Sequence, residues 1–211
     1  MEIVRGKFTA GNSTAILPGS FHPPTIAHFG LATAALKRVD QVIWTLPRAF
    51  PHKTYDGVSQ ADRLNLIGRL TAPEPRFLVA LSEGGLFVDM ALELRQLRPA
   101  EREIFLLCGR DAAERVVSWN YPEGDSIEAQ LSHYKLLVAA RAGAYQPPPA
   151  LAGYMEPLDT DTTWDEISSS RVRDAIQAKE EWRHLVPEAI HAVVEAIYSP
   201  SRLDSRNVRN R

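Results

Sequence analysis

The sequence predicts an α/β fold: a Rossmann-like parallel sheet with helices on both faces and a small C-terminal helical extension. Short apolar runs alternate with stretches of helical periodicity along most of the chain. Several of these runs are apolar almost throughout, as in strands that are buried on both faces of a sheet. Strands that alternate with helices form right-handed βαβ units and pair in parallel. The pattern does not predict the order of the strands.

The predicted strands cover residues 14–17, 41–46, 76–81, 103–108 and 134–139. Amphipathic segments between them, at residues 26–37, 60–70, 87–97 and 111–117, predict helices. After an extended proline-rich loop at 146–149, helices are expected over 169–179 and 187–198, with Pro187 in the first turn of the last one. We therefore divide the chain into a Rossmann-like core (1–166), a helical part (167–198) and a flexible tail (199–211).

Composition excludes several classes of protein. The formal net charge is −2 and charges of both signs are interspersed, which argues against nucleic-acid binding. The chain starts without the apolar region of a secretory signal, and no run reaches the ~18 apolar residues of a membrane span. One cysteine, Cys108, can form neither an internal disulfide nor a thiolate metal cluster. We expect a cytoplasmic protein that binds no nucleic acid, membrane or structural metal; a homo-oligomer is compatible with the sequence.

The first predicted strand is followed by a segment suited to phosphate, residues 18–28. Ligands of open α/β sheets bind beyond the carboxyl ends of the strands. Gly19 lets the backbone approach a ligand closely, and Thr25 and His28 share one face of the first helical turn beside its amides. An ordinary turn with a capping threonine and a surface histidine is the alternative. The segment matches neither a Walker A loop nor a dinucleotide-binding glycine pattern, which weakens the case for a kinase or a dehydrogenase.

A second candidate phosphate site lies far downstream, at residues 167–173. Three serines, Ser168 to Ser170, open a predicted helix, where hydroxyls cap amides or contact phosphate oxygens. Arg173, one turn later, supplies a guanidinium group, which is permanently charged and whose N–H donors match the geometry of phosphate. A helix cap followed by solvated arginines is the alternative interpretation.

Both segments resemble signatures of the nucleotidylyltransferase superfamily. Six residues are in register with the first signature: Gly19, Ser20, Phe21, Pro23, Thr25 and His28. His22 stands where Asp or Asn is more familiar, and Ala27 replaces the usual glycine. Residues 167–173 look like the second signature, Ile-Ser-Ser-Thr/Ser-x-x-Arg. Residues 183–187 resemble the Arg-Tyr-Leu-Val-Pro stretch of the nicotinate/nicotinamide mononucleotide adenylyltransferase family, and the similarity spans residues 19 to about 198.

Further positions resemble this pyridine-nucleotide branch. Lys53 lies in a Pro-His-Lys element, where it meets the triphosphate or is simply solvated. Gly109 and Asp111 resemble the Gly-Ala-Asp turn of the family; Asp111 accepts from a ribose hydroxyl there, or caps the next helix. Trp119 lies where family members stack an aromatic ring on the pyridine, although a core tryptophan is the alternative.

Two positions depart from the branch. Arg110 stands where a small residue is usual beside the substrate pocket. Residues 86–90 keep Asp89 but lack both threonines of the corresponding family segment, which helps to bind the nicotinoyl end. The departures concern the identity of the acceptor more than the type of reaction.

The resemblance implies adenylyl transfer from ATP to nicotinate or nicotinamide mononucleotide, with Mg²⁺ accompanying ATP, as a step of NAD biosynthesis. It implies a helical part (167–198) that completes the ATP site. The implied catalytic residues are His28, Thr25 and Arg173. The implied ATP-binding residues are Gly19, Ser20, Phe21, His28, Gly109, Asp111, Ser169, Ser170 and Arg173. The implied residues of the acceptor site are Lys53, Asp89 and Trp119.

Two other hypotheses stay open. The chain could be a nucleotidylyltransferase with another phosphorylated acceptor, although pantetheine-phosphate adenylyltransferases are usually shorter and lack the helical extension. The substitutions at His22, Ala27 and Arg110 are also compatible with a nucleotide-binding module without turnover. Binding of ATP without pyrophosphate release would distinguish such a module from an enzyme.

Overall fold

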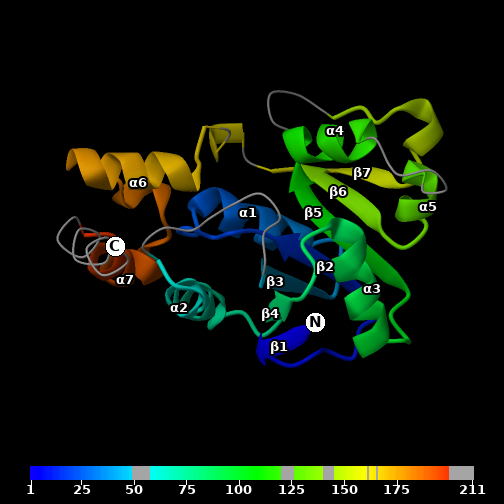
Figure 1. Ribbon diagram of the computed structural model, residues 1–211, viewed down its shortest axis with the longest axis horizontal. Helices are drawn as coiled ribbons and strands as arrows, with labels where there is room; N and C mark the ends of the chain where they lie inside the picture. The colour runs from blue at the N-terminus through cyan, green and yellow to red at the C-terminus, as the bar shows by residue number, and fades with distance from the viewer. Residues whose placement is uncertain (49–57, 120–125, 140–144, 161, 165, 200–211) are drawn as a thin grey trace, which may run out of the picture.

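A computed structural model gives the fold of the chain and describes residues 1–48, 58–119, 126–139, 145–160, 162–164 and 166–199. These residues form a mostly parallel sheet of seven strands in the order β1-β4-β3-β2-β5-β6-β7, which confirms the predicted α/β class (Figure 1). The strands are β1 (Glu2–Arg5), β2 (Ser13–Pro18), β3 (Gln41–Pro47), β4 (Phe77–Ser82), β5 (Glu103–Gly109), β6 (Lys135–Ala139) and β7 (Met155–Leu158).

The five predicted strands are confirmed, and the two edge strands of the sheet were missed. β7 pairs in parallel with β6, as expected for this fold. β1 pairs antiparallel with β4, which differs from the expectation of a purely parallel sheet. Both edge strands have four residues, too few for a clear apolar pattern. Pro157 also argues against a strand in the sequence, but a proline is tolerated in a strand at the edge of a sheet.

The strand order places a topological switch beside β2. From β2 the chain moves outward through β3 and β4, and then returns to the other side of β2 for β5, β6 and β7. Ile16 of β2 pairs with Leu106 of β5, so the loops after these two strands lie next to each other at the carboxyl end of the sheet. In open α/β sheets this is the place where ligands bind.

Seven α-helices lie in the described part of the chain: α1 (Ile26–Ala35), α2 (Gln60–Thr71), α3 (Phe87–Leu97), α4 (Arg110–Ser118), α5 (Ile127–Leu131), α6 (Ser169–Ala178) and α7 (His191–Tyr198). Short 3₁₀ helices are η1 (Pro149–Leu151), η2 (Thr162–Trp164), η3 (Arg183–Leu185) and η4 (Glu188–Ile190). Six predicted helices are confirmed, except that the last one is split into η4 and α7. The five-residue α5 was not predicted. The predicted tail, apart from Ser199, lies outside the described residues.

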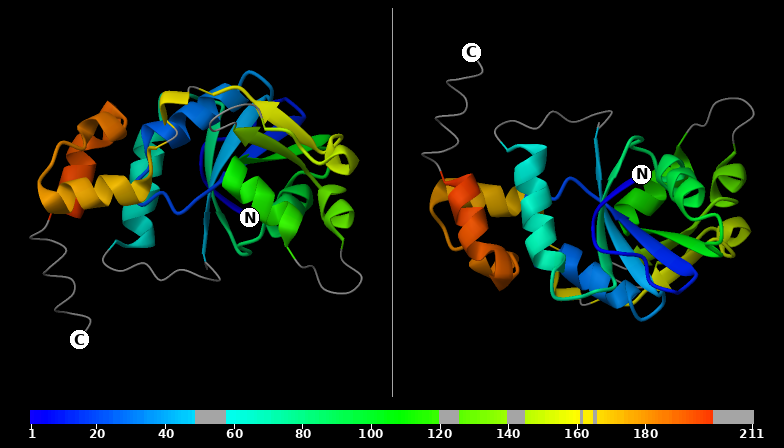
Figure 2. Two further views of the ribbon diagram at one scale, coloured as in Figure 1. Left: turned by 90° about the horizontal axis from the view of Figure 1, so that it is seen from above. Right: turned by 90° about the horizontal axis from the view of Figure 1, so that it is seen from below.

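The sheet separates two hydrophobic clusters. Figure 2 shows the helices that cover the two faces of the sheet. α3, α4 and α5 bury side chains such as Met90 and Leu131 on one face. On the other face, α1 and α2 share a cluster with α6 and α7, to which the last two contribute Val172 and Val194. The proposed boundary at residue 166 stays a prediction, and the C-terminal helices draw on the same core as α1 and α2. None of the helices in the described ranges is long and apolar enough to cross a membrane.

Gly30 couples α1 to the segment before α6. A Cβ atom on Gly30 would lie 1.8 Å from the ring of Trp164, so the indole occupies the space that a side chain on α1 would need. Glycine in the middle of a helix costs about 1 kcal/mol relative to alanine. The contact with Trp164 explains why glycine is nevertheless present here.

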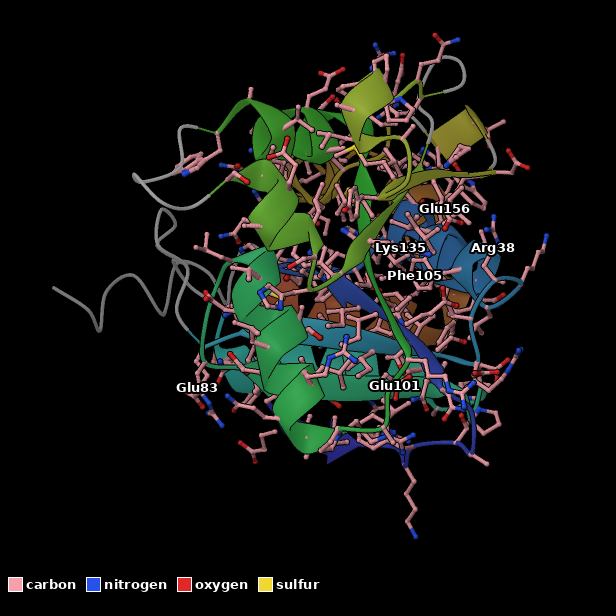
Figure 3. All side chains as sticks on the ribbon, turned by 90° about the vertical axis from the view of Figure 1, so that its right-hand side faces the viewer. Arg38, Glu83, Glu101, Phe105, Lys135 and Glu156 are labelled. Atoms are coloured by element: carbon pink, nitrogen blue, oxygen red, sulfur yellow. The ribbon has the colours of Figure 1, made fainter. Side chains whose placement is uncertain are left out.

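Exposed ion pairs join the strands β5, β6 and β7 (Figure 3). Lys135 Nζ lies 3.2 Å from Glu103 Oε1 and 3.7 Å from Glu156 Oε1, and 5.7 Å from the ring centroid of Phe105. Arg38, just beyond α1, also pairs with Glu156. Ion pairs at such exposure contribute little free energy each. In the register of these strands Lys135 lies opposite Phe105, and Glu156 lies opposite Leu137, so Glu103 and Glu156 are both diagonal neighbours of Lys135.

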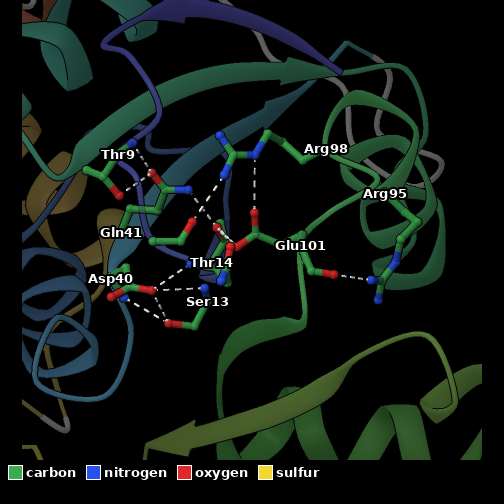
Figure 4. Close-up of polar contacts among 10 residues, drawn as sticks. Thr9, Ser13, Thr14, Asp40, Gln41, Arg95, Arg98 and Glu101 are labelled. Carbon is green, nitrogen blue, oxygen red and sulfur yellow. Dashed lines mark hydrogen bonds and ion pairs between the residues drawn. The ribbon is translucent and has the colours of Figure 1, made fainter.

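A buried polar network closes the amino-terminal end of the central strands (Figure 4). The Thr14 hydroxyl donates to Glu101 Oε1 (2.6 Å) and accepts from Gln41 Nε2 (2.8 Å). The amide of Thr9 donates to Gln41 Oε1 (2.9 Å), and Arg98 Nε lies 3.4 Å from Glu101 Oε2. Thr14 and Gln41 are fully buried and Glu101 nearly so. The network therefore ties β2 to β3 and to the segment that leads into β5.

Thr14→Val should lower the free energy of unfolding by ~1–3 kcal/mol, because it leaves buried groups of Gln41 and Glu101 without a partner. Thr14→Ser keeps the hydroxyl and is the matched control. Urea unfolding followed by circular dichroism measures both. Equal stability of Thr14→Val and Thr14→Ser would show that the network contributes little.

Candidate active site

The loop between β2 and α1 is held in an unusual conformation. The amide of Gly19 donates to the Thr45 carbonyl (3.1 Å), which extends the pairing of β2 with β3. Phe21 is fully buried and has a φ of 46°, a left-handed value that is uncommon for a residue with a side chain. Its ring lies against Gly19, where a Cβ atom would be only 2.8 Å from it. Glycine at position 19 is thus required by the packing of Phe21.

Thr25 and His28 form a reciprocal cap at the start of α1. The His28 amide donates to Thr25 Oγ1 (3.4 Å), and the Thr25 amide donates to His28 Nδ1 (3.1 Å). Because an amide can only donate, Nδ1 acts as an acceptor, and the proton of the neutral ring is on Nε2. This geometry confirms the capping role of Thr25, whereas His28 is half-buried and takes part in the cap, so it is not an ordinary surface histidine. The role of Nε2 as a donor to phosphate stays a prediction.

The start of α6 contacts this loop. Ser169 Oγ donates to the Pro23 carbonyl (2.7 Å) and Arg173 Nη1 donates to the His22 carbonyl (2.7 Å). Arg173 Nη2 also donates to Ser170 Oγ (3.1 Å). The two segments that the sequence marks as phosphate sites are therefore brought together in the fold.

The cap of α6 is Ser168, which the prediction of ATP-binding residues does not include. Its side chain accepts from the Arg171 amide (3.1 Å). Ser169 contacts the loop instead of capping the helix. Sequence position distinguishes these serines poorly, because any of them can cap an amide.

A histidine–tyrosine pair gives the loop a second tie to the C-terminal helices. His22 Nδ1 lies 2.8 Å from the Tyr198 hydroxyl at the end of α7. Burial, then Arg173, then Arg63 lower the pKa of His22 from 6.5 to about 4. Burial also raises the pKa of the Tyr198 hydroxyl. Both side chains are accordingly neutral at pH 7.

Arg63 of α2 is a residue of this region that the sequence analysis missed. It is 5% exposed, and its Nη1 donates to the Ser20 carbonyl (3.2 Å). Leu66, Ile67 and Leu70 follow it at helical spacing and are buried with it. A charge within such an apolar stripe signals a buried partner, and this pattern could have found it.

The residues after β5 lie beside the loop but are more exposed. Gly109 is the N-cap of α4, so the alternative in which Asp111 caps that helix is wrong. Asp111 is exposed, and the Arg110 side chain pairs with Glu114 (2.8 Å) one turn along α4. Trp119 is 58% exposed, which excludes the interpretation as a core tryptophan. The roles of Gly109, Asp111 and Trp119 in binding stay predictions.

Asp89 lies at the start of α3. Its carboxylate accepts from the Leu86 amide (3.1 Å), and its side chain packs so closely on Gly84 that a Cβ there would lie 2.3 Å away. Asp89 therefore has a capping role, and its role toward the acceptor stays a prediction. Lys53 lies outside the described residues, as does the rest of its Pro-His-Lys element.

Comparisons with known proteins give one result for the family and one for the fold. A model of the cytidylyltransferase-like family matches residues 16–175, which include both the loop after β2 and the start of α6. A solved structure of nicotinic acid mononucleotide adenylyltransferase from Plasmodium falciparum, in complex with NaAD, aligns with a TM-score of 0.65. The match covers 88% of this chain and 95% of that one at 15% identity, so it shows the fold alone.

Two relatives carry the name "Probable nicotinate-nucleotide adenylyltransferase". The relative from Geobacillus thermodenitrificans is 27% identical over 85% of this chain and 82% of its own length. The relative from Salinibacter ruber is 26% identical over 90% of this chain and 99% of its own length.

The pKa of His22 gives a prediction for stability at acid pH. Between pH 6.5 and about 4, the histidine of the unfolded chain takes up a proton that folded His22 does not. Protonation thus favours the unfolded chain, and the free energy of unfolding should fall as the pH drops through this range. His22→Asn removes the titrating group and can keep a bond to Tyr198.

Urea unfolding of both proteins at pH 7.5 and pH 5 measures this effect. The loss of stability should be smaller in His22→Asn than in the unsubstituted protein. A His22 that titrates near 6.5 by NMR would contradict the assignment.

Proposed function

The chain belongs to the cytidylyltransferase-like family, and we propose that it transfers the adenylyl group of ATP to nicotinate or nicotinamide mononucleotide. The products are the corresponding dinucleotide and pyrophosphate, and the reaction is a step of NAD biosynthesis. The names of the relatives support a pyridine mononucleotide as the acceptor, and among these favour nicotinate mononucleotide. Small-molecule substrates suffice for this reaction.

The observation that carries the proposal is the meeting of the two phosphate-binding segments. Ser169 and Arg173 hold the carbonyl groups of Pro23 and His22, so the loop after β2 and the start of α6 form one surface. This surface lies at the carboxyl end of the central strand, beside the topological switch. The family match extends over both segments.

The reaction is an in-line attack by the 5′-phosphate of the mononucleotide on the α-phosphorus of ATP. A bond forms between the phosphate oxygen and the α-phosphorus, and the bond to the pyrophosphate oxygen breaks, so that pyrophosphate leaves with the electron pair. The nucleophile arrives ionised, and no covalent enzyme intermediate is needed. Catalysis then rests on positioning and on stabilisation of charge.

His28 is the central catalytic group of the proposal. Its Nε2 carries the proton and donates to the α-phosphate as negative charge develops there. Thr25 fixes the ring through Nδ1 and so determines which nitrogen donates. Arg173 supplies a permanent positive charge beside the triphosphate.

The remaining groups bind the two substrates. The Gly19 amide is already used by Thr45, and the Phe21 ring fills the space of a side chain at position 19, so Gly19 contributes by holding the loop in its conformation. The triphosphate is bound by the amides of Ser20 and Phe21 and by the Ser170 hydroxyl, which accepts from Arg173 and can still donate its proton. The Ser169 hydroxyl donates its one proton to the Pro23 carbonyl, so Ser169 contributes by holding the loop. Gly109 and Asp111 contact the adenosine ribose, and Lys53, Asp89 and Trp119 bind the acceptor.

Mg²⁺ enters this scheme as Mg²⁺-ATP, with the phosphates as its main ligands. Among the described residues, no group of three or more His, Cys, Asp or Glu side chains could hold a metal ion. The protein side chains do not form a metal cage there, and no step is assigned to a protein-bound metal.

Pyrophosphate release from Mg²⁺-ATP should depend on a pyridine mononucleotide. The assay compares nicotinate mononucleotide, nicotinamide mononucleotide and no acceptor. Nicotinate mononucleotide is expected to give the faster release, and release without an acceptor should be negligible. If ATP binds but neither acceptor supports release, the protein uses another phosphorylated acceptor or is a nucleotide-binding module.

His28→Ala should lower kcat by a factor on the order of 10² or more, because it removes a donor to the charge of the transition state. His133, an exposed histidine that precedes β6, provides the control His133→Ala. Circular dichroism verifies that both variants are folded. Normal turnover of His28→Ala would rule out the catalytic role of this histidine.

A further inference from the structure

Three carbonyl groups of the loop between β2 and α1 accept hydrogen bonds from side chains of distant elements. The donors come from α2 and α6, so these helices hold the loop from two sides. The pairs are Arg63 Nη1 with Ser20 O (3.2 Å), Arg173 Nη1 with His22 O (2.7 Å) and Ser169 Oγ with Pro23 O (2.7 Å).

Only one of these three carbonyl groups shares its peptide bond with an N–H. The His22 and Pro23 carbonyls are each followed by a proline, which has no amide hydrogen. The Ser20 carbonyl is followed by the amide of Phe21. In a trans peptide unit the C=O and N–H groups point in opposite directions. Arg63 therefore fixes the direction of the Phe21 N–H by holding the Ser20 oxygen.

The Phe21 amide makes no hydrogen bond to a backbone or side-chain acceptor of the described residues, although Phe21 is fully buried. A buried amide without a partner costs free energy, and an acceptor supplied by a ligand would remove this cost. The left-handed backbone of Phe21 is compatible with the turns in which successive amides form an anion-binding concavity. A rotation of the Ser20–Phe21 peptide would turn a carbonyl oxygen toward the anion instead, and the two would repel each other.

The burial of Arg63 indicates that its charge is retained for a purpose other than packing. The other residues of its helical stripe, Leu66, Ile67 and Leu70, are apolar and buried. Burying a guanidinium group costs free energy unless hydrogen bonds compensate, and apolar replacements of buried charges are often neutral or stabilising. An apolar residue at position 63 would complete the stripe but could not hold the Ser20 carbonyl.

We propose that Arg63 is a positioning residue, which orients the Ser20–Phe21 peptide so that the Phe21 N–H faces the phosphates of the nucleotide. Arg63 does not touch the nucleotide itself. The identification of the anion as ATP rests on the proposed function.

The test is the binding of Mg²⁺-ATP to Arg63→Met, measured by calorimetry. The dissociation constant should rise about tenfold, as expected for one lost charge-assisted interaction. In the ligand-free variant, the amide resonance of Phe21 should also move in an NMR spectrum. Arg69→Met, an exposed arginine of the same helix, is the matched control and should change neither quantity.

Arg63→Lys separates positioning from stability. Lysine keeps a charged donor with shorter reach, so ATP binding should weaken less than in Arg63→Met. This variant also decides the question if Arg63→Met does not fold. A merely structural role would lower the free energy of unfolding but leave the ATP affinity of the folded variants unchanged, and that result would overturn the proposal.

The outcomes also separate this proposal from the proposed function. ATP binding that depends on Arg63, without pyrophosphate release by the unsubstituted protein, would support Arg63 and contradict the adenylyl transfer. Pyrophosphate release with an ATP affinity that is independent of Arg63 would support the adenylyl transfer and contradict the role of Arg63. A protein that does not bind Mg²⁺-ATP at all would contradict both.

Discussion

The contact between the start of α6 and the loop after β2 is the constraint on which the rest of the candidate site depends. Ser169 donates to the carbonyl group of Pro23, and Arg173 donates to that of His22. These partners are separated by 146 and 151 positions in the chain. Neither segment forms a site alone, because one supplies backbone amides and a histidine and the other supplies hydroxyls and a charge. The pair of His22 and Tyr198 adds a second tie from α7. The C-terminal helices thus contribute residues to the candidate site and hold its loop.

The central strand β2 is fixed at both of its ends by different physical means. At its start, Thr14 belongs to a buried polar network with Gln41 and Glu101. At its end, Gly19 continues the pairing with β3, and Phe21 packs on that glycine. A loop that leaves such a strand has little freedom. This rigidity suits a reaction that depends on the positions of charged groups rather than on a covalent intermediate.

The sequence predicts the elements that have a strong period and the site residues that are close together in the chain. The interior strands and the long helices were correct, and Thr25 and His28 do cap α1. The edge strands β1 and β7 could not be predicted, since four residues with polar or proline positions carry no clear period. Arg63 was missed for a different reason. Its place in an apolar stripe signals a buried partner, but a local pattern does not report that this partner is the Ser20 carbonyl of the loop after β2.

The contact between Gly30 and Trp164 limits which C-terminal segments of related proteins could replace that of this chain in a chimera. The indole fills the volume above a helix position that has no side chain, so the two positions are complementary in size. A chimera that joins the first part of this chain to the C-terminal helices of a relative would have to preserve this match. A bulky residue at position 164 combined with any residue other than glycine at position 30 would push α6 away from the loop. A small residue at position 164 combined with glycine at position 30 would leave a void. The compatibility of two parental sequences can therefore be assessed at this pair of positions before a chimera is made.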